Sequence, residues 1–294
     1  MSSVTIRGAK HSYSLTTPTQ FANSKLHQPA PFAIAFLHGW MLSQAYWQPL
    51  IQQLEANFSC LSYDLRGFGR SELGDDQEYS LISYAKDLEE LLDRLGIEQV
   101  WLVGHSLGGA IALWAANSLC DRVLGVVCLN AGGGIYIKEE FEKFRTAGKI
   151  ILNLRPRWLQ NLTPVHSQFA KDSVHTPLDM QWGKQRVIDF VSAKYPAAKG
   201  TLLDSTSEQE VHKLPQIVSK LRQPVYFIAG ANDKIMEPKY VRHLASFHPS
   251  FNGCGENVFE LPECGHMAML EQTNLLHTLL LDLFAKPVNA PSYL

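Results

Sequence analysis

Residues 100–109 read Val-Trp-Leu-Val-Gly-His-Ser-Leu-Gly-Gly, and an alanine-rich segment, 110–119, follows directly. The apolar start predicts a buried strand, and the alanine-rich segment predicts a helix. The glycines at 104 and 108 place Ser106 in the pattern Gly-x-Ser-x-Gly, in which a strand turns sharply into a helix and exposes the serine hydroxyl. We therefore expect Ser106 at the carboxyl end of a strand, next to a helix N-terminus that favours developing negative charge.

The alternation of short apolar runs and helical segments continues on both sides of this stretch. Strands are predicted at 31–37, 58–63, 100–103, 123–129, 225–229 and 257–261, and helices at 45–56, 84–95, 110–119 and 268–284. This order predicts an α/β fold whose mostly parallel sheet is covered by helices on both faces.

The alternation lapses between residues 135 and 212, where helical patches, prolines and aromatic residues occur without a convincing strand. We interpret this segment as a helical cap over one edge of the sheet. The core is then formed by residues 1–134 and 213–294. Two ordinary crossover helices with long loops are the alternative interpretation.

Composition excludes several classes of protein. The 294 residues are 46% hydrophobic and 18% charged with a net charge of −2, which excludes a disordered chain and argues against a nucleic-acid partner. The longest apolar stretch falls short of the roughly 20 residues of a membrane span, and the amino-terminal residues lack a signal peptide's apolar region. Five cysteines without a CxxC pair argue against a disulfide framework or a metal site. We expect a cytoplasmic protein without metal or cofactor.

The serine hydroxyl needs a base, which an acid must orient. Asp233 directly follows the predicted strand 225–229, and His266 follows the last predicted strand, so the chain order is Ser106, Asp233, His266. We predict these three as a catalytic triad. An ordinary turn aspartate and a structural histidine are the alternatives, and Asp64, the rival acid, precedes the serine and is better explained as support for its own loop.

Two backbone N–H groups are expected to stabilise the oxyanion. One is that of Leu107, directly after the serine. The other is that of Trp40 in the sequence His-Gly-Trp, which ends the first strand's loop at 38–40. Trp40 and Met41 are also the candidate substrate-binding residues, although Trp40 could simply pack under the cap.

Five segments together resemble the α/β-hydrolase superfamily over about residues 30–285. They are 38–40, 64–71, 104–109, 230–233 and 265–266. The first two are similar to the carboxylesterase and cofactor-free perhydrolase branch. Efficient perhydrolases of that branch often carry a proline in the oxyanion loop, whereas Met41 and Leu42 stand here, which favours ester hydrolysis. The resemblance also implies that dehalogenases and epoxide hydrolases carry an aspartate at the place of Ser106, so the serine separates this chain from them.

The predicted function is therefore cofactor-independent hydrolysis of a small-molecule carboxylic ester through an acyl-enzyme. One alternative is a triad-dependent C–C lyase that resembles the synthase of menaquinone biosynthesis, although residues 110–113 lack the arginine which that enzyme places there. A thioesterase acting on an anionic substrate is another. A binding protein or receptor on a hydrolase fold is the alternative from a different class.

Residues 143–199 carry ten Lys and Arg residues against three acidic residues. This imbalance is hidden in the small net charge of the whole chain. Solvated helix faces would explain it. A basic cap would also steer an anionic substrate or contact an anionic, lipid-bearing membrane surface.

Overall fold

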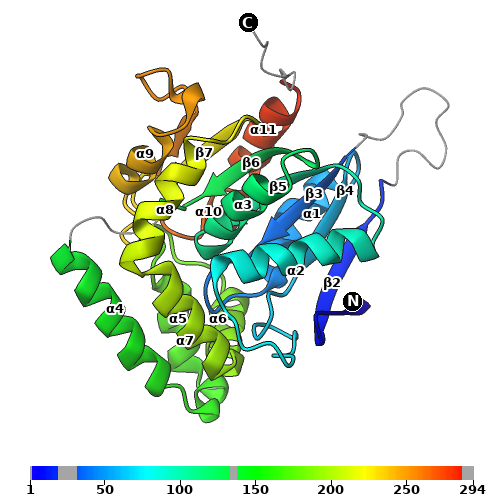
Figure 1. Ribbon diagram of the computed structural model, residues 1–294. Helices are drawn as coiled ribbons and strands as arrows, with labels where there is room; N and C mark the ends of the chain where they lie inside the picture. Colours follow the sequence, from blue (N-terminus) through cyan, green and yellow to red (C-terminus); the bar gives the residue numbers. More distant parts are fainter. Residues whose placement is uncertain (1, 19–31, 133–137, 287–294) are drawn as a thin grey trace, which may run out of the picture.

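The computed structural model describes residues 2–18, 32–132 and 138–286 (Figure 1). Its strands form one eight-stranded sheet in the order β1-β2-β4-β3-β5-β6-β7-β8. The strands are β1 (Ser2–Ile6), β2 (Ala9–Thr16), β3 (Ala33–Leu37), β4 (Ser59–Tyr63), β5 (Val100–His105), β6 (Val123–Leu129), β7 (Val225–Gly230) and β8 (Val258–Leu261). From β4 to β8 along the sheet all neighbours pair in parallel, which confirms the predicted α/β fold.

Helices cover both faces of the sheet (Figure 1). They are α1 (Gln48–Leu54), α2 (Leu81–Arg94), α3 (Leu107–Ser118), α8 (Glu208–Val218), α9 (Pro238–Ala245), α10 (Ala268–Glu271) and α11 (Thr273–Phe284). Side chains alternate along β3: Ala35 and Leu37 pack with α2, α3 and α8, whereas Ile34 and Phe36 pack with α1 and α11. Because both faces of the sheet are covered, the central strands β3 and β6 are apolar throughout, whereas β4 contains two serines and β8 a glutamate.

Two features were not predicted. The amino-terminal segment forms a β1–β2 hairpin that pairs antiparallel with β4 at the sheet edge. Its sequence is polar because an edge strand need not bury both faces. The final predicted helix, 268–284, is divided at Gln272, whose φ of −129° and ψ of 41° interrupt the helical backbone between α10 and α11.

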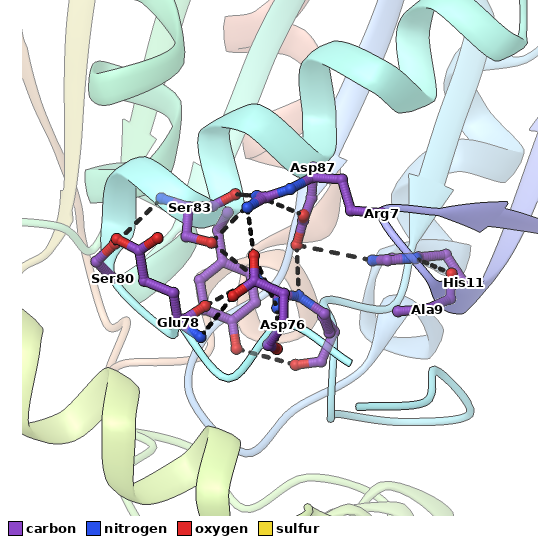
Figure 2. Close-up of polar contacts among 10 residues, drawn as sticks. Arg7, Ala9, His11, Asp76, Glu78, Ser80, Ser83 and Asp87 are labelled. Carbon is purple, nitrogen blue, oxygen red and sulfur yellow. Dashed lines mark hydrogen bonds and ion pairs between the residues drawn. The ribbon is translucent and has the colours of Figure 1, made fainter. Parts of the chain in front are cut away.

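A buried ionic network fastens the hairpin to α2 (Figure 2). Arg7 of the hairpin pairs with Asp76 and donates to Asp87 Oδ1 at 3.1 Å. The fully buried Arg66 donates to Asp87 Oδ2 at 2.9 Å. Burial raises the pKa of Asp87, but the guanidinium groups oppose that effect. Each buried charge therefore has an opposite charge in contact, as burial requires.

Between β6 and β7 the described residues form five α-helices and a 3₁₀ helix, the last of them being α8. We name α4 (Lys138–Asn153), η3 (Arg157–Asn161), α5 (Thr163–Lys171), α6 (Met180–Ser192) and α7 (Tyr195–Ser205) the helical insertion. The expected start of the cap, residue 135, lies outside the described residues, and the expected end, residue 212, lies within α8, which packs on α3. The division of the chain into core and cap stays a prediction.

The insertion lies against the loop that follows β4. Lys194 N–H donates to the Gly67 carbonyl at 2.8 Å. Gly67 has a φ of +82°, and a Cβ at that position would lie 2.3 Å from the Ala197 side chain. Glycine is therefore required there both by the backbone conformation and by the close approach of α7.

Candidate active site

The turn between β5 and α3 places Ser106 in a strained backbone conformation, with φ 52° and ψ −116°. Its N–H donates to the Leu129 carbonyl at 2.9 Å, which fixes the turn against β6. A Cβ on Gly104 would lie 2.3 Å from the Gly108 carbonyl oxygen, and one on Gly108 would lie 2.3 Å from the Leu37 carbonyl oxygen. The two glycines are therefore needed for close packing of the turn, and strain at one residue is typical of a functional site.

Asp233 and His266 are in contact at the same edge of the sheet. His266 Nδ1 lies 2.7 Å from Asp233 Oδ2. Asp233 Oδ1 accepts from the N–H groups of Ile235 and Met236 at 2.8 and 2.9 Å. Burial alone would raise the pKa of Asp233, but His266 and these two donors lower it below its ordinary value. The ionised carboxylate therefore keeps the proton on Nδ1 and leaves Nε2 of His266 as the proton acceptor.

His105 connects the serine turn to the loop that carries His266. Its Nε2 donates to the His266 carbonyl at 2.7 Å, and the two imidazole rings lie 4.8 Å apart between centroids. Burial, with the nearby His266, lowers the pKa of His105 to about 3, so this ring is neutral. Because Ser106 is the next residue, these contacts bring the three predicted triad residues to one place. The contact of Ser106 with His266 itself stays a prediction.

A second buried histidine supports the loop that was predicted to form the oxyanion site. His38 Nδ1 donates to the Gly39 carbonyl at 2.8 Å, and His38 Nε2 accepts from the Leu65 N–H at 2.9 Å. These partners select one neutral tautomer, and burial lowers the pKa of His38. Within the described part of the chain, the N–H groups of Trp40 and Leu107 donate to no other group. Their role in binding an oxyanion stays a prediction.

The side chains of this loop point to different neighbours. Met41 is buried in the core and has a φ of 54°. Its contact with substrate stays a prediction. Trp40 Nε1 donates to the Ala198 carbonyl of α7 at 2.9 Å. Ser43 Oγ donates to Asp189 Oδ2 of α6 at 2.8 Å. The helical insertion is therefore hydrogen-bonded to two residues that follow β3, Trp40 and Ser43.

Asn130 is a site residue that the sequence analysis missed. It follows β6 directly, is fully buried, and has a φ of 49°. Its Nδ2 donates to Asp233 Oδ2 at 2.8 Å and to the Gly265 carbonyl at 3.1 Å. It thus ties the acid to the loop of the histidine. A polar residue directly after a buried parallel strand was the available signal, because such strand ends converge at one edge.

The rival acid Asp64 has a structural role. Its Oδ1 accepts from the Gln44 N–H at 2.7 Å, and its Oδ2 accepts from the Arg70 N–H at 2.9 Å. It joins the loops that follow β3 and β4. Across residues 2–18, 32–132 and 138–286, no group of three or more His, Cys, Asp or Glu side chains is placed to bind a metal ion. Nor is any helix in these segments long and apolar enough to span a membrane.

The fold and this site define a class of protein. Residues 33–273 match the family described as the alpha/beta hydrolase fold, and the chain belongs to that family. The resemblance noted in the sequence is thereby confirmed.

Several relatives carry hydrolase names. The chain is 25% identical over 222 residues to the bifunctional esterase/perhydrolase DCH of Acinetobacter calcoaceticus, covering 69% of this chain and 75% of that protein. It is 24% identical over 269 residues to the soluble epoxide hydrolase of Corynebacterium sp. (strain C12), covering 86% and 90%. The first curated relatives that it matches, RutD of Variovorax paradoxus (strain S110) among them, are covered over only 29% to 41% of their length.

Solved structures agree on the fold. A thermophilic esterase from Thermogutta terrifontis superposes with a TM-score of 0.72 at 20% identity, covering 98% of this chain and 100% of that one. At such identity the similarity shows the architecture alone. The chemistry must be argued from the site.

Proposed function

We propose that the chain is a cofactor-independent serine hydrolase that cleaves a carboxylic ester of a small molecule. The contact of His266 Nδ1 with the ionised Asp233, at the strand edge where Ser106 turns outward, is the observation that carries the proposal. A base oriented in this way activates a serine for acyl transfer when it accepts the proton of the serine hydroxyl.

In the first half-reaction, Ser106 Oγ attacks the ester carbonyl carbon while His266 Nε2 takes the hydroxyl proton. The N–H groups of Leu107 and Trp40 donate to the oxyanion of the tetrahedral intermediate. The C–O bond to the alcohol then breaks, and His266 returns its proton to the leaving oxygen. Asp233 keeps the imidazole in the required tautomer throughout.

In the second half-reaction, water takes the place of the alcohol. His266 Nε2 removes a proton from the water, whose oxygen attacks the acyl carbon. Collapse of the second tetrahedral intermediate breaks the bond to Ser106 Oγ, and the serine recovers a proton from His266. The carboxylic acid leaves, so ester and water give acid and alcohol.

Ser106, and not the set of relatives, favours an ester over an epoxide as substrate class, because a soluble epoxide hydrolase is also among the relatives. Epoxide hydrolases of this family are expected to carry an aspartate nucleophile, and Ser106 stands at that position here. Among the relatives, DCH is named an esterase/perhydrolase, and a protein of Aliivibrio salmonicida, 24% identical over 221 residues, is named a pimeloyl-[acyl-carrier protein] methyl ester esterase.

Turnover of p-nitrophenyl esters tests the proposal. We expect multiple turnovers, labelling of Ser106 by a fluorophosphonate, and a loss of kcat of about 10⁴- to 10⁶-fold in Ser106→Ala. Full turnover by Ser106→Ala would refute the mechanism, and a folded protein that neither turns over esters nor reacts with the probe would indicate a binding protein. Esters from C2 to C16 would then define the acyl pocket.

A second candidate function rests on the charge of the insertion. The positive excess in residues 143–199 favours an anionic substrate, as a thioesterase or a C–C lyase with the same triad would have. Comparison of kcat/KM on matched oxygen esters and thioesters, each in neutral and carboxylated form, separates these functions. Preference for a neutral oxygen ester would reject this second candidate.

A further inference from the structure

The end of α4 and the turn after it, which lie away from the sheet at the bottom of Figure 1, contain several apolar residues. Five of them are exposed: Ile150, Ile151, Leu154, Trp158 and Leu162. Leu154 is 65% and Trp158 60% exposed, although side chains of these types are usually well covered in a folded protein. We name residues 149–162 the apolar turn. Large apolar groups gathered in this way indicate a surface that meets a partner.

Polar contacts fix the apolar turn to the rest of the helical insertion. Arg155 donates to the carbonyls of Leu152, Phe190 and Ala193 at 3.1, 2.8 and 3.1 Å. His166 Nε2 lies 2.8 Å from the Gln160 carbonyl oxygen. Trp158 lies in η3, and its side chain is 60% exposed. The apolar turn is therefore a supported edge whose apolar side chains face outward.

The sequence that contains the apolar turn is basic. Residues 143–171 contain six basic residues and no acidic residue. Arg155 is used by the contacts above, whereas Lys149 and Arg157 are exposed, and neither forms an ion pair with a side chain that the structure describes. Exposed cations interleaved with exposed Trp, Leu and Ile side chains complement a surface that is negative outside and apolar beneath.

We propose that the apolar turn binds the headgroup region of an anionic lipid bilayer. Trp158 and Leu154 enter the interface, where tryptophan is favoured, and Lys149 and Arg157 lie against lipid phosphates. A second copy of the chain fits less well, because two such surfaces would bring like charges together. The proposal is independent of the chemistry proposed for Ser106, because none of these residues belongs to that site.

Co-sedimentation of the full chain with vesicles tests this surface. We expect binding to vesicles of phosphatidylcholine with phosphatidylglycerol, and little to phosphatidylcholine alone. Binding should weaken between about 20 and 500 mM salt, as the Debye length falls from roughly 20 to 4 Å. Lys149→Gln with Arg157→Gln should lower the partition coefficient about 25-fold, about fivefold for each charge.

Matched variants separate the apolar and charged contributions. Leu154→Ser with Trp158→Ser should lower binding at least about tenfold. Lys86→Gln with Lys220→Gln removes two exposed charges outside the helical insertion. This control should leave vesicle binding unchanged. Circular dichroism of each variant reports folding, so this test does not depend on the proposed function. If Leu154→Ser with Trp158→Ser unfolds, Lys149→Gln with Arg157→Gln still tests the proposal.

Three results would overturn the proposal. One is equal binding to neutral and anionic vesicles. Another is an equal loss of binding in the Lys86 and Lys220 control. The third is a dimer in sedimentation velocity that Trp158→Ser dissociates, because the apolar turn would then contact a second copy of the chain.

Discussion

Asp189 of α6 is a buried carboxyl group whose negative charge destabilises the folded state. Burial raises its pKa from the ordinary 3.8 to about 6, despite the hydrogen bonds from Ser43 and from Gln185, whose Nε2 donates at 3.0 Å. Asparagine has the same shape, and its amide can donate to Ser43 Oγ while its oxygen accepts from Gln185. We therefore expect Asp189→Asn to stabilise the protein at neutral and alkaline pH.

The size and sign of this effect follow from proton linkage. Because the pKa of Asp189 is higher in the folded than in the unfolded state, its contribution to the free energy of unfolding falls as pH rises from about 4 through about 6. A shift of about two units corresponds to about 3 kcal/mol in total, of which about 1.5 kcal/mol is lost between pH 5 and pH 8. The stability of the variant relative to the parent should thus increase by about 1.5 kcal/mol between these pH values.

Urea unfolding followed by tryptophan fluorescence at both pH values measures this difference, and groups that titrate in both proteins cancel. Asp179→Asn is the matched control: this aspartate precedes the same helix, is exposed, and its side chain caps no N–H there. We expect no pH-dependent difference for the control. A stability difference between Asp189→Asn and the parent that is equal at pH 5 and pH 8 would refute the reasoning.

Three further predictions concern the site and its support. Gly108→Ala puts a Cβ 2.3 Å from a β3 carbonyl oxygen, so we expect a loss of about 3 kcal/mol or more in thermal unfolding, together with loss of turnover. Asn130→Ala removes a charge-assisted hydrogen bond from Asp233 worth about 1.5–3 kcal/mol, so kcat should fall about 10- to 100-fold with KM little changed; an unaltered kcat would show that Asn130 is dispensable. Arg66→Met leaves the buried Asp87 short of a partner and should cost about 3–5 kcal/mol in urea unfolding, whereas adding Asp87→Leu should recover part of the loss.

The parts of the fold that were predictable depend on local sequence. The buried strands β3 and β6 are continuous apolar runs, and the glycines around Ser106 are required by backbone atoms a few residues away and on β3. The positions of Asp233 and His266 followed from chain order, because successive strand ends meet at one edge. The β1–β2 hairpin left no such pattern, since its stability depends on the network around Arg66, far along the chain.

The supporting residues of the site were not predictable for the same reason. Asn130 acts on Asp233 across 103 residues, and Ser43 meets Asp189 across 146. Neither pair of residues leaves a recognisable periodicity or spacing in the sequence. His105 was visible beside Ser106, but its bond to the His266 carbonyl depends on how two distant loops pack.

The hydrogen bonds from Trp40 to Ala198 and from Ser43 to Asp189 have a consequence for protein engineering. If the insertion lines the proposed substrate site, exchange of helices α6 and α7 for those of a relative would alter that site, replace Asp189 and shift the Ala198 carbonyl. A chimera that alters substrate range should therefore also alter the rate of the chemical step. A chimera that retains Asp189 and the backbone position of Ala198 would keep both hydrogen bonds. Its substrate range could then be changed separately from the rate of the chemical step.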